Sequence, residues 1–138
     1  MIIARQRILF ATVSLIHTCY RITDIDRSVA FYEALGFEDK GKMPIGDSAI
    51  NVFMGLPEDG PEPRLELTYN IGQDEPYDLG TGYGHIAITT ADLDGALTRL
   101  AGQGIEPERA PYTVSDGGSR LCFVRDPDGY RIELIERG

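Results

Sequence analysis

The stretch HTCYRITDIDRSVAFYEALGFE at residues 17–38 recurs in the same chain as HIAITTADLDGALTRLAGQGIE at residues 85–106. A shift of 68 residues places the opening histidine of one copy on that of the other. An aspartate and a glycine also coincide at this shift, as the pairs Asp24 with Asp92 and Gly36 with Gly104. Self-similarity of this kind is the signature of a duplicated structural unit, and we interpret the chain as two copies of one unit.

The far end of each copy repeats as well. Arg64-Leu65-Glu66-Leu67 and Arg131-Ile132-Glu133-Leu134 coincide at a shift of 67 residues. The opening histidine of each copy is therefore followed by a glutamate at nearly the same distance, 49 residues on in the first copy and 48 in the second. We expect a single domain over residues 1–138, with repeat one at about 13–72, repeat two at about 82–137 and a linker over residues 72–84 that contains proline and glycine.

Each copy reads as a strand, a helix and then further strands. The first strand is predicted over residues 14–22, the first helix over about residues 26–35, and residues before about 12 as an extension. The second helix is the clearest, with an N-cap at Asp92, an end at Gly104 and an apolar stripe of Leu93, Ala96, Leu97 and Leu100. Two βαβββ units predict an α+β fold, in which helices cover a curved, mixed and mostly antiparallel sheet.

Composition excludes several classes of protein. Thirteen basic and twenty-two acidic residues give a net charge of −9, which argues against a nucleic-acid partner. The apolar run at residues 8–16 is far too short to span a membrane. Cys19 and Cys122 form no CxxC motif, so we expect a reducing, cytoplasmic compartment without disulfides, and both cysteines buried as small apolar residues.

The two histidines of the chain, His17 and His85, occupy equivalent positions, and so do Glu66 and Glu133 within apolar strands. Taken singly, each histidine is more often structural, and each glutamate could form an ion pair across the sheet with an arginine, Arg64 or Arg131. The repeat favours another interpretation, because equivalent strands of two paired copies meet around a pseudo-twofold axis. Two imidazoles and two carboxylates converging there would bind a divalent metal.

Strand alternation places two more polar residues beside these candidates. Arg21 follows His17 by four residues and Asn70 follows Glu66 by four, so each shares the face of its candidate ligand. At ~3.3 Å per residue, both lie roughly 13 Å from the expected metal. A thiol adduct of tripeptide size could extend from the metal to this pair. The alternative is that both are solvent-facing residues of no special role.

The expected donor set suits nickel, cobalt, zinc or manganese, completed by one or two waters. Its two negative charges balance the metal, which then acts as a Lewis acid able to polarise a carbonyl and stabilise an enediolate. A glutamate that leaves the metal could carry a proton. A site of this kind is able to promote proton transfer next to a carbonyl.

Four motifs together resemble glyoxalase I of the vicinal oxygen chelate superfamily: His17-Thr18-x-x-Arg21, residues 65–70 (LELTYN), residues 80–87 (GTGYGHIA) and residues 126–134 (DPDGYRIEL). The resemblance covers about residues 15–136. It implies a lyase that isomerises the hemithioacetal of methylglyoxal and glutathione, or a similar thiol, to S-lactoylglutathione by proton transfer through an enediolate. Its biological role would be methylglyoxal detoxification.

The resemblance also implies residue roles. His17, Glu66, His85 and Glu133 would be the metal ligands, and Glu133 would be the main base, with Glu66 as its counterpart on the other side. Arg21 and Asn70 would hold the γ-glutamyl end of glutathione. A homodimer with shared active sites follows, with one divalent metal per site. The short chain resembles the nickel- and cobalt-activated group more than members that use zinc.

One departure concerns the thiol. Bacterial relatives commonly carry a lysine just before the Gly-Gly of the second repeat, where this chain has Ser115 and Asp116, with Arg120 as a possible replacement. The identity of the thiol therefore stays open. Two further functions of the superfamily stay open as well, a metal-free drug-sequestering module of the bleomycin-resistance type and an acyl-CoA epimerase.

Overall fold

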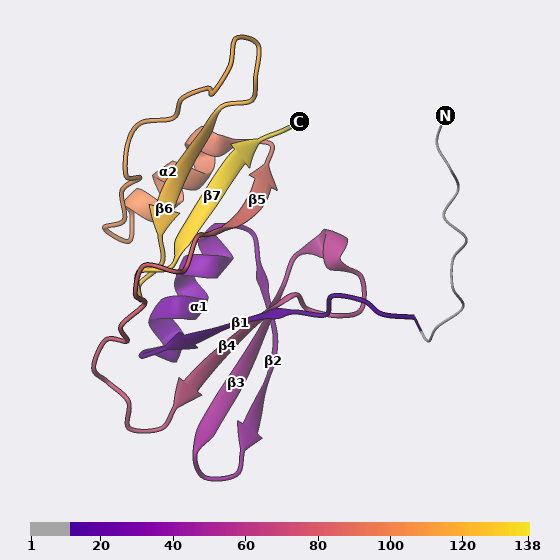
Figure 1. Cartoon of the computed structure of the whole chain (residues 1–138), viewed down its shortest axis with the longest axis vertical. Helices are drawn as coiled ribbons and strands as arrows, with labels where there is room; N and C mark the ends of the chain where they lie inside the picture. Colours follow the sequence, from indigo (N-terminus) through magenta and orange to yellow (C-terminus); the bar gives the residue numbers. More distant parts are fainter. Residues whose placement is uncertain (1–11) are drawn as a thin grey trace.

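The first half of the chain forms a four-stranded mixed sheet in the computed structural model, which describes residues 12–138 (Figure 1). The strand order is β1 (Thr18–Ile22), β4 (Leu65–Asn70), β3 (Ala49–Gly55) and β2 (Glu38–Ile45). β1 runs parallel to β4, whereas β4, β3 and β2 are antiparallel neighbours. A short 3-10 turn, Pro57–Asp59, lies in the connection from β3 to β4.

The second half repeats this arrangement with three strands, in the order β5 (Ile86–Thr90), β7 (Arg131–Glu136) and β6 (Leu121–Arg125). β5 is parallel to β7, and β6 is antiparallel to it. The expected βαβββ pattern is thus confirmed in the first half and lacks one regular strand in the second. The segment where that strand was expected precedes β6 in the chain and lies beside it. It is joined to β6 only by isolated hydrogen bonds, such as the one from Glu108 N to Phe123 O at 2.9 Å. It contains Pro107 and Pro111, which have no N–H to donate to a ladder.

Both helices form where the sequence predicts them. α1 spans Ile25–Ala34, and α2 spans Leu93–Ala101. Asp24 and Asp92 cap the two N-termini with their side chains. Each carboxylate accepts a hydrogen bond from the backbone N–H group three residues later in the chain. The glycines expected to end the helices, Gly36 and Gly104, adopt φ of 104° and 77°, which only glycine tolerates easily.

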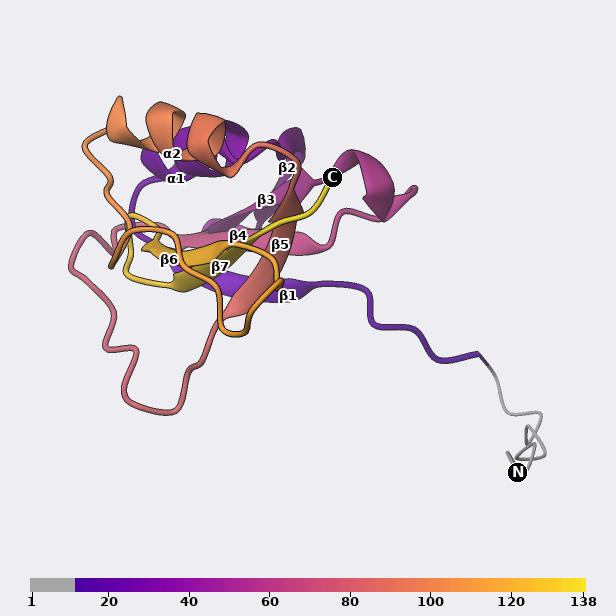
Figure 2. The ribbon, with the colours of Figure 1, turned by 90° about the horizontal axis from the view of Figure 1, so that it is seen from above.

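The two helices lie on the same side of the sheets and pack against each other (Figure 2). Two side chains of α2 and its C-terminal turn reach backbone carbonyls of α1: Arg99 Nε donates to Ala34 O at 2.8 Å and Gln103 Nε2 to Ala30 O at 3.0 Å. The two halves of one chain therefore associate through their helices.

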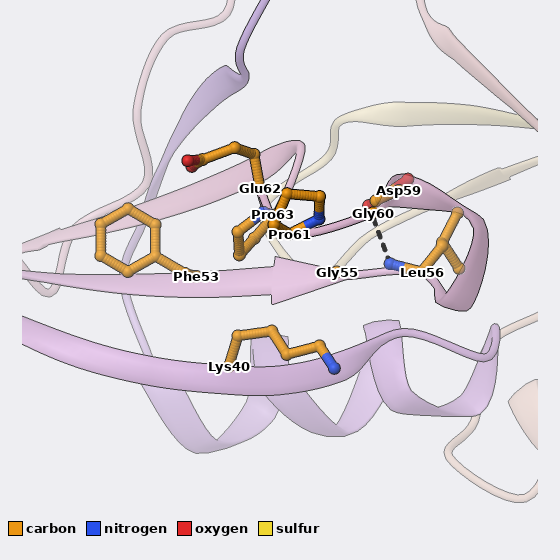
Figure 3. A pocket seen from close by; sticks show the side chains of 9 residues that line it. All are labelled: Lys40, Phe53, Gly55, Leu56, Asp59, Gly60, Pro61, Glu62 and Pro63. Carbon is orange, nitrogen blue, oxygen red and sulfur yellow. Dashed lines mark hydrogen bonds between the residues drawn. The ribbon is translucent and has the colours of Figure 1, made fainter.

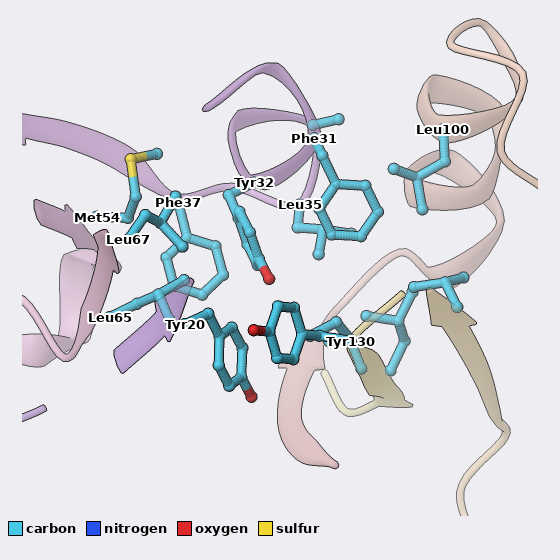
Figure 4. Close-up of a cluster of buried hydrophobic side chains, with 14 of the residues drawn as sticks. Tyr20, Phe31, Tyr32, Leu35, Phe37, Met54, Leu65, Leu67, Leu100 and Tyr130 are labelled. Atoms are coloured by element: carbon cyan, nitrogen blue, oxygen red, sulfur yellow. The ribbon is translucent and has the colours of Figure 1, made fainter. Parts of the chain in front are cut away.

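One apolar core lies between the helices and the sheets and includes residues of both halves (Figure 4). Alternate residues of the central strands point into it, namely Leu65 and Leu67 of β4 and Ile132 and Leu134 of β7. The residues between them, Glu66 and Glu133, must face the opposite side. We term this opposite side the open face of each sheet.

The first strand begins at Thr18 rather than at residue 14, because the pairing of β1 with β4 starts there. The expectation of a buried Cys19 is wrong: Cys122 is buried, but Cys19 is exposed because it lies on the open face. The expected N-terminal extension lies almost entirely outside the described residues, while the expected linker over residues 72–84 contains no helix or strand.

Candidate metal centre

The two parallel strand pairs bring a histidine and a glutamate together in the same way. In the first half, Glu66 of β4 is the register partner of Cys19, two residues after His17. In the second half, Glu133 of β7 is the register partner of Ala87, two residues after His85. Each histidine directly precedes its strand, so both imidazoles can reach the glutamate on the open face.

The side chains meet in both halves. His17 Nε2 contacts the Glu66 carboxylate, and His85 Nε2 lies 3.8 Å from Glu133 Oε1. We term these pairs half-site one and half-site two. The glutamate side chains are only 12% and 16% exposed, while the imidazoles are about one third exposed. Each half-site therefore holds one nitrogen and one carboxylate donor, partly shielded from solvent.

The alternative ion pairs with arginine do not form within the part of the chain that the structure describes. Arg64 Nε lies 3.9 Å from Asp59 Oδ1. Arg131 donates two hydrogen bonds of 2.8 Å to the Glu108 carboxylate, and this hydrogen bonding lowers the pKa of Glu108. Both arginines thus pair with other carboxylates, and the contacts of Glu66 and Glu133 are with the two histidines.

The two half-sites remain apart in a single chain. Across residues 12–138, no group of three or more histidine, cysteine, aspartate or glutamate side chains is close enough to hold one metal ion. β1 and β5, which each follow a candidate histidine, are both edge strands of their sheets. One chain therefore presents two incomplete donor sets rather than one complete set.

Arg21 and Asn70 lie on the open face of the first sheet, as predicted. Arg21 is exposed and is the register partner of Thr68. Asn70 Nδ2 donates to Tyr77 Oη at 2.9 Å, so the linker contacts this side chain. Arg120, considered as a replacement for the missing lysine, is instead paired with Asp94 at 3.0 Å and with the glutamate that ends β7 at 3.3 Å.

Two phenylalanines lie beside the glutamates and were not predicted from the sequence. Phe53 of β3 lies across from Glu66, and Phe123 of β6 lies across from Glu133. Phe123 packs edge-on against the His85 ring, with 5.0 Å between ring centres. The Arg131 guanidinium lies 4.1 Å from the centre of the Phe123 ring. Each carboxylate thus has an apolar neighbour at an equivalent place. A comparison of the two copies beyond the histidine and glutamate motifs could have found this match.

One cavity borders half-site one, and a second lies elsewhere in the first half of the chain. A cavity of about 330 Å³ is lined by His17 and Leu65 and also by residues 86–88 of β5, between the two edge strands. A second cavity, of about 550 Å³, lies between Lys40, Phe53 and the loop over residues 55–63 (Figure 3). In that loop, Leu56 N donates to Asp59 Oδ2 at 2.8 Å. Half-site one is therefore accessible from the side of β5.

The chain is similar to several known proteins. A lactoylglutathione lyase of Arabidopsis thaliana is 42% identical over 89% of this chain and 44% of its own length. A probable lactoylglutathione lyase of Synechocystis is 38% identical over 88% of this chain and 94% of its own length. The crystal structure of glyoxalase I from Zea mays matches with a TM-score of 0.80 and 36% identity, over 90% of this chain and 44% of that one. The chain thus spans less than half the length of the plant relatives.

The family model with the description Glyoxalase/Bleomycin resistance protein/Dioxygenase superfamily matches residues 14–134, nearly all of the residues that the structure describes. The match includes both half-sites, both helices and the strands between them. The resemblance drawn from the four motifs is therefore confirmed, and the chain belongs to the glyoxalase, bleomycin resistance protein and dioxygenase superfamily.

Proposed function

We propose that this chain is a metal-dependent lactoylglutathione lyase, which isomerises the hemithioacetal of methylglyoxal and glutathione to S-lactoylglutathione. The observation that carries the proposal is the equivalent geometry of two His–Glu pairs, His17 with Glu66 and His85 with Glu133. The printed names of the relatives, lactoylglutathione lyase and glyoxalase I, support it.

The four side chains fit a divalent metal by their chemistry. Two imidazole nitrogens and two carboxylates are a common donor set for first-row metals, and each pair already converges on one point of the open face. His17, Glu66, His85 and Glu133 would hold the ion, which supplies Lewis-acid polarisation of the substrate carbonyl when bound. We favour nickel, with cobalt, zinc and manganese as alternatives.

The chain's own carboxylates would move the proton. Glu133 takes the proton from C1 of the hemithioacetal and an enediolate results; a proton returned to C2 then completes the thioester. Glu66 faces the substrate from the opposite side as the counterpart base. The low exposure of both carboxylates and their phenylalanine neighbours limit water near the transferred proton.

Binding of the thiol adduct is assigned to the open face of the first sheet. Arg21 supplies a cation against the net charge of −9, and Asn70 supplies an amide, so the pair can hold the zwitterionic γ-glutamyl end. Asn70 would have to exchange its bond to Tyr77 for one to the substrate. Arg120 is already paired with two carboxylates, so it does not replace the lysine expected near the glycyl end of glutathione. The thiol can therefore be glutathione or a similar compound.

A second copy of the chain would complete each site. The helices hold the two halves of one chain together, and β1 and β5 are edge strands of separate sheets, which a partner could extend. In a twofold dimer, half-site one of each protomer would meet half-site two of the other, with two shared sites per dimer. We further propose a cytoplasmic location, which two cysteines without a disulfide support. None of the described helices has the length and apolar character needed to cross a membrane.

The test is a direct assay of the purified chain with methylglyoxal and glutathione, before and after removal of metal by a chelator. We expect thioester formation that disappears on chelation and returns with Ni²⁺. Ligand binding unaffected by chelation, without turnover, would favour a sequestering module, and exchange of the α-proton of an acyl-CoA ester without lyase activity would favour an epimerase. Either result would overturn the proposal.

A further inference from the structure

Three tyrosine rings pack together where the two halves of the chain meet. Tyr20 of β1 stacks on Tyr130, with 4.2 Å between ring centres and 7° between planes (Figure 4). The ring of Tyr83, at the end of the linker, lies edge-on to both, at 5.7 and 5.5 Å. The rings fill the junction, and their hydroxyl groups then have to find partners within it.

The Tyr83 hydroxyl has two partners. It donates to the backbone carbonyl oxygen of Arg131 at 3.2 Å, and it is hydrogen-bonded to the Tyr20 hydroxyl. Because a hydroxyl has only one proton, Tyr83 must accept from Tyr20 while it donates to Arg131. Phenol hydroxyl groups are protonated at neutral pH, so both act as donors.

The bond from Tyr83 to Arg131 lies close in the chain to both residues of half-site two. Tyr83 is two residues before His85, and Arg131 is two residues before Glu133. The pairing of β5 with β7 begins only at Ile86 with Ile132, so the segment that holds Tyr83 lies outside the strand ladder. The hydroxyl therefore links the two chain segments that lead into His85 and Glu133.

Among the residues that the structure describes, the first half has no hydroxyl at the equivalent place, and there the carbonyl oxygen of Arg64, the equivalent of Arg131, accepts from Thr18 N at 3.0 Å. The residue equivalent to Tyr83 at the shift of 68 is Leu15, which is 83% exposed. Tyr83 also stands between two glycines, Gly82 and Gly84, which gives this backbone more freedom than other residues would. A backbone with this freedom before a candidate ligand can be constrained by a side-chain bond, and the tyrosine hydroxyl provides one.

We propose that Tyr83 is a positioning residue for half-site two, which fixes His85 and Glu133 relative to each other through its bond to the Arg131 carbonyl. The proposal rests on the proposed role of these two residues as metal ligands. Without the hydroxyl the ring still fills the junction and the β5–β7 ladder remains, but the segment that leads into His85 loses its bond to the Arg131 carbonyl. A metal then has to order them on binding, which lowers its affinity.

The experiment compares three variants with the same chemical change in the full-length chain. Tyr83→Phe removes both hydroxyl bonds, and Tyr20→Phe removes only the bond that Tyr20 donates. The control Tyr32→Phe removes a buried bond to Asp126 Oδ2 at 2.6 Å, which touches neither half-site. For each we measure the affinity of the metal-free protein for Ni²⁺ by calorimetry, unfolding by urea, and kcat and KM at saturating Ni²⁺.

We expect Tyr83→Phe to weaken Ni²⁺ binding by about five- to tenfold, as the loss of one net hydrogen bond implies. Its kcat should fall more than its KM changes, because Glu133 is the assigned base. Tyr20→Phe should have a smaller effect on Ni²⁺. Tyr32→Phe should lose at least as much stability while its Ni²⁺ affinity stays within about twofold of the parent.

Two results would overturn the inference, and they are distinguishable. If Tyr83→Phe and Tyr32→Phe have the same Ni²⁺ affinity while His85→Ala abolishes binding, Tyr83 positions nothing and the proposed ligands stand. If His85→Ala binds Ni²⁺ like the parent, the ligand assignment fails, and the role of Tyr83 fails with it.

Discussion

Tyr32 of α1 donates a hydrogen bond of 2.6 Å to Asp126 Oδ2, which ties the first helix to the turn before β7, 94 residues later in the chain. The same carboxylate accepts from the backbone N–H groups of Asp128 and Tyr130. Asp126 is only 4% exposed, and this burial raises the pKa of its carboxyl to about 6. The junction of the two halves therefore contains a carboxyl that resists ionisation.

The first prediction concerns pH. The folded protein retains the Asp126 proton up to about pH 6, whereas the unfolded chain loses it near pH 4, so folding stability from this group falls as pH rises between these values. The loss is on the order of 2–3 kcal/mol. Urea unfolding of the metal-free Asp126→Asn variant from pH 4 to 7 should lack this decline.

Asp94→Asn is the control for this series. The hydrogen bond from Arg120 lowers the pKa of the exposed Asp94 carboxyl, so its contribution has the opposite sign and is lost as pH falls. If the free energy of unfolding of Asp126→Asn declined with pH as steeply as that of the parent, another group would be responsible for the pH dependence.

The second prediction concerns the base. Glu133→Gln keeps the size of the side chain but cannot accept the C1 proton, so kcat should fall by ~10²–10⁴-fold in protein that is fully loaded with metal. Metal content must be measured alongside, because Glu133 is also a proposed ligand. Glu136→Gln, at the end of the same strand and paired with Arg120, is the matched control and should retain activity. Parental turnover by Glu133→Gln would assign the base elsewhere.

The third prediction concerns the metal. Metal-free protein reconstituted with one ion at a time should regain most activity with Ni²⁺ or Co²⁺ and little with Zn²⁺. The measurement is initial rate against metal content per chain. The nickel assignment would be wrong if the zinc-loaded protein outperformed both.

The fourth prediction concerns the assembly. One inactive variant carries His17→Ala and Glu66→Ala, and a second carries His85→Ala and Glu133→Ala. Unfolded together and refolded, they should form heterodimers with one intact site and one site without ligands. Activity should return to about a quarter of the parent's if half the dimers are mixed and each has one of two sites.

Each variant refolded alone is the control and should stay inactive. Heterodimers that form, as shown by a tag on one variant, but have no activity would place all four ligands in one chain. That outcome contradicts the shared site and leaves the ligand assignment itself intact.

Most of the local structure could be predicted from the sequence. The helices follow from aspartate caps, an apolar stripe and terminating glycines, which act within a few residues of one another. The expectation that each copy supplies one histidine and one glutamate followed from the repeat, and the parallel pairing of β1 with β4 and of β5 with β7 then places them side by side. The family and the candidate ligands were accessible in the same way.

Other features depended on contacts between distant parts of the chain. Cys19 is exposed because β1 is an edge strand with its alternate face open, and strand alternation alone does not say which face is covered. The separation of the half-sites follows from the packing of α1 on α2 and of Tyr83 between β1 and β7. A hydrophobic pattern records which residues avoid water, but the partner that covers each of them is decided only when the whole chain packs.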